Sequence, residues 1–149
     1  MLIANQIQKQ YGSVRVLKSV SCTIHAGEVV SIVGSSGAGK TTLLSILGTL
    51  ELPDAGTVQM EGVNLSSLNS KKLAAFRNSN MGFVFQFYQL LPEFTALENV
   101  MMPALIGGKS KSQSKSRAEE LLTELGLGER LLHKPSMLSG GEQQRVAVA

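Results

Sequence analysis

The feature that most constrains this chain is a glycine-rich stretch between an apolar run and an amphipathic segment. Residues 34–42 read Gly-Ser-Ser-Gly-Ala-Gly-Lys-Thr-Thr and fit G-x-x-x-x-G-K-[ST], a pattern typical of a phosphate-binding loop. The apolar run over 29–33 predicts a buried strand, and residues 42–47 predict a helix. Because a strand, a loop and a helix in this order distinguish a real phosphate loop from a chance match, we expect a phosphate site here.

Each residue type in this loop has a chemical role. The glycines allow backbone conformations closed to other residues, so their N–H groups can face an anion at the positive end of the helix dipole. The Lys40 ammonium can reach terminal phosphates, and the Thr41 hydroxyl suits a Mg²⁺ ion that bridges them. The predicted phosphate-binding residues are Gly34, Ser35, Ser36, Gly37, Ala38, Gly39, Lys40, Thr41 and Thr42.

The elements around the loop predict a mixed α/β fold. Antiparallel strands ahead of a parallel-sheet unit suggest one mixed sheet, and no convincing strand follows residue 86. We therefore expect a nucleotide-binding core over 1–85 and an α-helical subdomain over 86–149, with a polar loop at 107–116. The expected strands are 2–8, 14–24, 29–33, 57–60 and 81–85, and the expected helices are 42–47, 69–77, 95–106 and 117–127.

Three further positions have more than one interpretation. Tyr11 could be a core residue, turn filler or a platform on which a base stacks. Gln86 directly follows a predicted strand, at the edge where open α/β sheets bind ligands, so it either caps the strand or meets a nucleotide's metal or attacking water. Ser139 and Glu142 form a capping box, and the glycines at 140–141 leave bare amides that are either an anion site or incidental.

Composition narrows the class of protein. A net charge of +3 over 149 residues does not suggest a nucleic-acid surface. No apolar run approaches the ~20 residues that span a bilayer, and the N-terminus lacks the pattern of a signal peptide. The single cysteine, Cys22, cannot form an internal disulfide, which fits a reducing compartment. We therefore expect a cytosolic location.

Together these elements resemble the nucleotide-binding subunit of ATP-binding cassette (ABC) transporters, a P-loop NTPase, from Tyr11 to Ala149. Residues 34–42 resemble the Walker A motif, and Leu-Ser-Gly-Gly-Glu-Gln at 138–143 resembles the family signature. The resemblance implies ATP and Mg²⁺ as cofactors, with Tyr11 stacked on adenine. It also implies that Lys40 and Gln86 take part in catalysis, and that Thr41 and Gln86 lie at the metal.

The resemblance also implies partners. In this family two subunits form a homodimer head to tail, with ATP between the Walker A loop of one and the signature of the other. The expected signature contacts are Ser139, Gly140, Gly141 and Glu142. Integral membrane permease subunits are implied as well, which places the subunit peripherally on the cytoplasmic face of the inner membrane; no nucleic acid is expected.

A finer similarity lies in residues 82–100, which are similar to the lipoprotein-releasing (LolD-type) and MacB-type export branch, with the cell-division ATPase FtsE a close relative. This implies the ATPase motor of lipoprotein release or of related export. A soluble ABC-type ATPase that acts on nucleic acid or ribosomes, and an inactive nucleotide-binding fragment, are the alternatives.

One family element has no counterpart here. The pattern requires an apolar strand that ends in Asp-Glu, the Walker B motif, but the only aspartate is Asp54, in a Pro-Asp-Ala-Gly turn. The D-loop aspartate is missing too, and neither His25 nor His133 is placed as the switch histidine. We therefore expect the N-terminal portion of a longer subunit, with a sheet incomplete at its C-terminal side, that binds nucleotide but hydrolyses it poorly.

Overall fold

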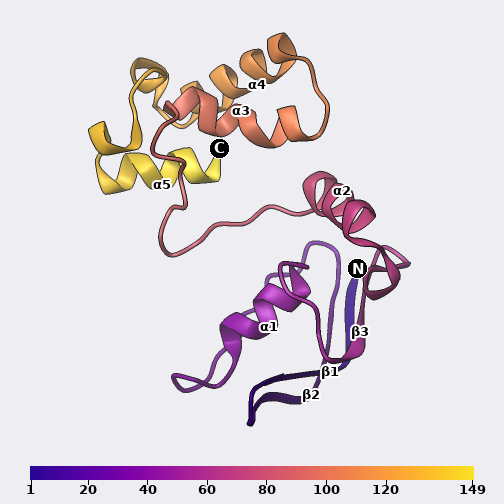
Figure 1. Ribbon diagram of the computed structural model, residues 1–149. Helices are drawn as coiled ribbons and strands as arrows, with labels where there is room; N and C mark the ends of the chain where they lie inside the picture. The colour runs from indigo at the N-terminus through magenta and orange to yellow at the C-terminus, as the bar shows by residue number, and fades with distance from the viewer. The chain divides into compact units, whose positions relative to one another are not determined.

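A computed structural model describes residues 1–149 as two compact units, Met1–Arg77 and Asn78–Ala149. The first contains the sheet and the phosphate loop, and the second is helical (Figure 1). Residues 78–85, which the sequence groups with the core, belong to the helical unit. No helix in the structure combines the length and the apolar character needed to cross a membrane.

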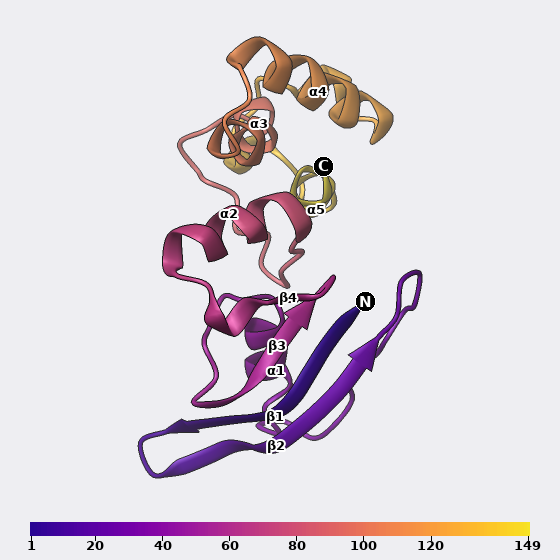
Figure 2. The same cartoon turned by 90° about the vertical axis from the view of Figure 1, so that its right-hand side faces the viewer.

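The first unit is built on a four-stranded sheet in the order β2-β1-β3-β4, in which every pair is antiparallel (Figure 2). Its strands are β1 (Leu2–Tyr11), β2 (Val14–Ile24), β3 (Ala55–Met60) and β4 (Val63–Asn64). Helix α1 (Lys40–Leu47) buries Leu43, Ile46 and Leu47. The short 3₁₀ turn η1 (Leu65–Ser67) and helix α2 (Ser70–Asn80) follow β4. The expected antiparallel N-terminal strands are confirmed.

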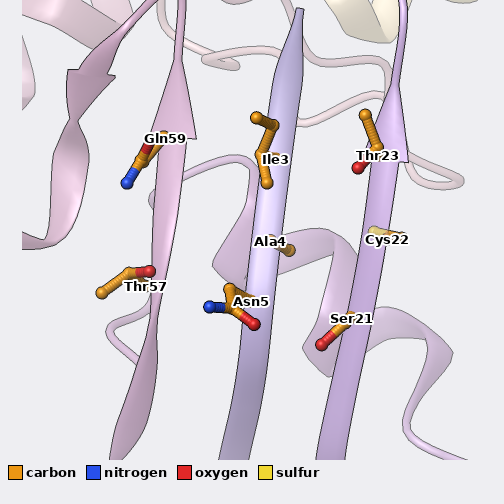
Figure 3. A pocket seen from close by; sticks show the side chains of 8 residues that line it. All are labelled: Ile3, Ala4, Asn5, Ser21, Cys22, Thr23, Thr57 and Gln59. Carbon is orange, nitrogen blue, oxygen red and sulfur yellow. The ribbon is translucent and has the colours of Figure 1, made fainter.

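The two faces of this sheet differ in character. Ala4, Ile7, Leu17 and Val58 are buried and belong to the apolar core. On the other face, polar side chains line a shallow hollow of about 340 Å³ together with Ile3, Ala4 and Cys22 (Figure 3). Cross-strand neighbours such as Asn5 and Thr57 lie side by side there. Ala4 and Ile7 are three positions apart on β1, with a register shift between them, and both are buried in the core.

The predicted parallel core is not formed. Neither 29–33 nor 81–85 is a strand, and Val29, Val33 and Val84 are 96%, 86% and 61% exposed. Both runs have the apolar composition of buried strands, but a strand also needs a neighbour to satisfy its N–H and C=O groups. Neither run pairs with a strand of the only sheet present. Gln86 accordingly does not follow a strand end.

The second unit packs α3 (Ala96–Ile106), α4 (Lys111–Glu124) and α5 (Gly140–Val148) around one apolar cluster. Two 3₁₀ turns, η2 (Gly128–Arg130) and η3 (Pro135–Met137), connect α4 to α5. The cluster comprises Ala96, Leu97, Met101, Ala118, Leu122, Leu127, Leu138 and Val146.

Helix α4 begins earlier than the sequence analysis predicts. Ser110 and Gln113 form a capping box, in which the Ser110 hydroxyl accepts from the Gln113 N–H at 3.3 Å. The polar residues from 111 onward therefore belong to a helix, in which Ser114 is buried and the residues at 111–113 and 115–117 are exposed. Only the start of the predicted loop at 107–116 is correct. The pattern S-x-x-Q was a usable signal for this start.

Gly56 provides a test of the sheet. Its φ is +93°, and a Cβ there would lie 2.5 Å from the carbonyl oxygens of Asn5 and Gln6, next to the irregular register of β1. Gly56→Ala is expected to lower the free energy of unfolding by more than about 2 kcal/mol, because backbone atoms must move. The matched control is Gly62→Ala, with φ +78° and no atom within 4 Å, which should lower it by about 1 kcal/mol. Urea unfolding measures both, and equal losses would contradict the close approach.

Candidate nucleotide-binding site

The phosphate loop is held against β2 by a close backbone approach. Gly39 has φ +86° and occupies the N-cap position of α1. A Cβ at Gly39 would lie 2.8 Å from Val16 Cγ1 and 2.9 Å from Leu17 Cδ2, so only glycine fits without displacing these side chains. Gly37, with φ +78°, gives the loop a second left-handed turn. The loop therefore begins α1 at a fixed place beside the sheet.

The Lys40 ammonium lies back over this loop. Its Nζ donates to the carbonyl oxygens of Gly34 at 2.9 Å and Ser35 at 2.7 Å. None of the ion pairs in the structure includes Lys40. An anion that enters the loop would therefore compete with two neutral carbonyls for this charge and would not have to break a salt bridge.

The start of α1 differs from that of every other α-helix in the chain. No side chain accepts from its first N–H groups, and its first turn contains no acidic residue. By contrast, Thr95, Ser110 and Ser139 cap α3, α4 and α5, and the Asn69 side chain accepts from the Lys72 N–H at the start of α2 at 2.9 Å. Bare N–H groups and an uncompensated helix dipole make the start of α1 suited to an anion. The Thr41 side chain is exposed in this first turn.

Tyr11, at the end of β1, is 46% exposed and belongs to the same unit as the loop. Its hydroxyl lies 2.7 Å from each carboxylate oxygen of Glu51 and donates to this group. This hydrogen bond is the main cause that raises the pKa of Tyr11, whereas a hydrogen bond with the Thr42 side chain acts in the opposite direction. Glu51 follows the end of α1, so the hydrogen bond ties Tyr11 to the segment after the helix that begins at the phosphate loop. The role of Tyr11 as a base platform stays a prediction.

Gln86 and the signature residues lie in the second unit. Gln86 is exposed, in a segment without regular structure. At the signature, Ser139 donates through its N–H and its hydroxyl to Glu142 Oε2, both at 2.8 Å, and the Glu142 N–H donates back to the hydroxyl at 3.3 Å. The predicted capping box is therefore confirmed. It occupies the Ser139 N–H and leaves the exposed amides of Gly140 and Gly141 without a partner inside the helix.

Two groups of residues at these sites were missed by sequence reasoning. Lys9 and Glu51 surround Tyr11, and Arg130 donates to Glu142 Oε1 at 3.2 Å. Glu51 is 40 residues from Tyr11 and Arg130 is 12 from Glu142, so no local pattern pairs them. The chain also contains no cluster of three or more His, Cys, Asp or Glu side chains that could hold a metal ion.

The pKa of Glu142 gives a prediction for this helix start. Hydrogen bonds from the Ser139 N–H and hydroxyl, followed by Arg130, lower it from 4.5 to about 2. A carboxyl group whose pKa is lower in the folded chain than in the unfolded chain stabilises the fold. This stabilisation is fully present above the pKa of the unfolded chain and is lost as the pH falls through the pKa of the folded chain. The thermal midpoint of Glu142→Gln should therefore lie below that of the native chain at pH 6, and the gap should shrink below pH 4.5. Glu93→Gln, an exposed side chain in the same unit, is the control; a gap independent of pH would contradict the assignment.

Comparison with known proteins places these features in a family. The model of the ABC transporter family matches residues 17–149. The lipoprotein-releasing system ATP-binding protein LolD of Bacteroides thetaiotaomicron is 60% identical over 149 residues, which is 100% of this chain and 68% of that protein. LolD of Porphyromonas gingivalis is 58% identical over 146 residues, which is 98% of this chain and 67% of that protein.

Solved structures agree with the sequence comparison. A dimeric structure of the ATP-binding cassette MJ0796, in a post-hydrolysis state bound to ADP and Pi, matches with a TM-score of 0.89 and 38% identity. The match covers 99% of this chain and 67% of that one. The chain thus spans about two thirds of the length of these relatives. On its sequence and its fold, the chain belongs to the ABC transporter family.

Proposed function

We propose that this chain is the ATP-binding part of an ABC transporter subunit that drives lipoprotein release or related export. The observation that carries the proposal is the 60% identity to a LolD protein over all 149 residues. It is combined with a phosphate loop that begins a helix without a side-chain cap and whose lysine is in no ion pair. A soluble ABC-type ATPase that acts on nucleic acid is the alternative, but no feature of the structure favours it.

The first unit would bind the nucleotide through its own residues. The loop amides from Gly34 to Thr42 and the start of α1 surround the phosphates, and Lys40 exchanges its two carbonyl acceptors for phosphate oxygens. Tyr11 supplies its exposed ring to the adenine. The exposed Thr41 hydroxyl is an oxygen ligand of the kind that Mg²⁺ accepts, with other ligands from phosphate and water. The Gln86 amide, which belongs to the second unit, is the other metal ligand that the family resemblance implies. Mg²⁺ would neutralise phosphate charge.

The second unit would meet the nucleotide of a second subunit. The MJ0796 cassette that this chain resembles is dimeric with ADP and Pi bound. In a homodimer of that kind, the signature residues Ser139, Gly140, Gly141 and Glu142 would face the partner's ATP. The free amides of Gly140 and Gly141 are the direct donors, while Glu142 keeps the Ser139 N–H occupied. Integral membrane permease subunits would bind this motor on the cytoplasmic face of the inner membrane.

Hydrolysis requires a carboxylate that activates water, and the first unit has none to spare. Asp54 accepts from Lys9 and from the Gln10 N–H, and Glu51 accepts from Tyr11 and pairs with Lys9. Glu28 accepts from the His25 N–H, and Glu61 pairs with the N-terminal ammonium. All four carboxylates of this unit are therefore engaged in structural contacts. We infer that this chain binds ATP and turns it over far more slowly than a subunit of the full length of its relatives.

The binding role of Lys40 is directly testable. Lys40→Ala should weaken binding of Mg-ATP by at least about tenfold, because a charge-assisted hydrogen bond to phosphate is lost. Lys72→Ala, which removes an exposed lysine of α2 in the same unit, is the matched control and should bind as the native chain does. Isothermal titration measures both affinities, and a Lys40→Ala chain with native affinity would exclude the loop as the nucleotide site.

The transport role needs a different measurement. The chain carrying an affinity tag should co-purify from membranes with an integral permease, in an interaction that survives nuclease treatment. ATP turnover of the purified 149-residue chain should be far below that of a full-length relative. A salt-sensitive complex with RNA or DNA and no permease would instead support the soluble ABC-type alternative.

A further inference from the structure

Tyr11 is surrounded by charged groups that a base-stacking platform alone does not need. Lys9, two residues before it on β1, lies with its Nζ 5.6 Å from the centre of the Tyr11 ring. The same Nζ is 3.1 Å from Glu51 Oε1, 3.2 Å from Asp54 Oδ1 and 2.8 Å from the carbonyl oxygen of Leu52. A lysine ammonium has three donors, and these three acceptors use all of them.

The charged cluster of Lys9, Glu51 and Asp54 beside Tyr11 is partly shielded from solvent. The Lys9 side chain is only 14% exposed and that of Glu51 29%, compared with 50% for Asp54. Asp54 is further fixed because its Oδ2 accepts from the Gln10 N–H at 2.7 Å, which ties it to the strand that carries Lys9. A bonded network of this kind orders its side chains better than an isolated surface ion pair does.

Two contacts of this cluster bear on the orientation of the Tyr11 ring. The carboxylate of Glu51 holds the hydroxyl at the tip of the ring, and the Lys9 ammonium lies over one face. The conformation of a tyrosine side chain is set by two torsions, χ1 and χ2. Because Glu51 holds the hydroxyl and Lys9 lies over one face of the ring, both torsions are restricted. The ring is then ordered before any ligand arrives, which removes an entropic cost from binding.

The cluster also ties the ring to the phosphate loop. Glu51 lies in the segment that follows the end of α1, and its carboxylate accepts from the Tyr11 hydroxyl. The helix whose first turn would bind phosphates is thus joined to the ring at its C-terminal end. This connection sets the distance from the ring to the phosphate loop, and a nucleotide must match that distance to use both.

We propose that Glu51 and Lys9 are positioning residues that orient Tyr11 as a preformed platform for the base of the bound nucleotide. The proposal rests on the proposed nucleotide site and deepens it by naming the groups that fix the ring. Neither side chain touches the nucleotide, so both act through Tyr11. Their contribution should therefore appear only for ligands that carry a base.

The experiment compares binding of Mg-ATP with binding of inorganic tripolyphosphate, which has phosphates but no base. Tyr11→Phe keeps the ring and removes its bond to Glu51, and Glu51→Ala removes the acceptor. Each should weaken the binding of Mg-ATP about three- to tenfold, as expected for one side chain that must be ordered on binding. The affinity for tripolyphosphate should not change. Glu51→Gln retains an oxygen acceptor and should recover part of the lost affinity. Glu129→Ala, an exposed carboxylate in the other unit, should have no effect.

Tyr11→Ala separates this proposal from the proposed site itself. One outcome is that Tyr11→Ala weakens the binding of Mg-ATP while Tyr11→Phe and Glu51→Ala bind it as the native chain does. In that case the base stacks on Tyr11, but Glu51 does not position the ring. If Tyr11→Ala has no effect, the ring is not a base platform. If Tyr11→Phe and Glu51→Ala weaken the binding of tripolyphosphate as much as that of Mg-ATP, the charged cluster supports the phosphate loop instead of orienting the ring. This outcome also overturns the proposal. Thermal midpoints of all variants identify any that fail to fold.

Discussion

The close contact of Gly39 with β2 is the constraint on which the candidate site depends. Because its φ is +86° and two side chains of β2 occupy the space of a Cβ, the loop can turn sharply and begin α1 directly against the sheet. A residue with a side chain would move the loop away from Val16 and Leu17. The first N–H groups of α1 would then lose their fixed place, and with it the preorganisation that an anion site requires.

The helix starts show how the chain distributes its unsatisfied donors. Side chains accept at the starts of α2, α3, α4 and α5, whereas α1 has only glycine there. Orphan amides normally lower stability, so a helix that leaves them uncapped beside an ammonium that is in no ion pair is consistent with a ligand that completes them. The start of α5 is intermediate, since Glu142 occupies the N–H of Ser139 as an internal anion, while the glycines that follow stay open.

Sequence reasoning succeeded where the determinants are local. The helix after the phosphate loop, the capping box at Ser139 and the antiparallel strands at the N-terminus depend on neighbours within a few residues. The strands expected at 29–33 and 81–85 failed because a strand depends on a partner that local composition does not specify. The contact of Tyr11 with Glu51 was equally out of reach, because it joins residues 40 positions apart through the packing of α1 on the sheet.

The distribution of charge within the first unit connects the two halves of the site. Its cations include one lysine that is fully paired, Lys9, and one that is in no ion pair, Lys40. The carboxylates of Glu51 and Asp54 are both held at Lys9, and no carboxylate pairs with Lys40. The charge of Lys40 therefore adds a positive potential at the loop that no ion pair cancels, which favours a polyphosphate. The same bonds fix the Tyr11 ring, so one cluster both preserves the charge that attracts the phosphates and orders the surface available to the base.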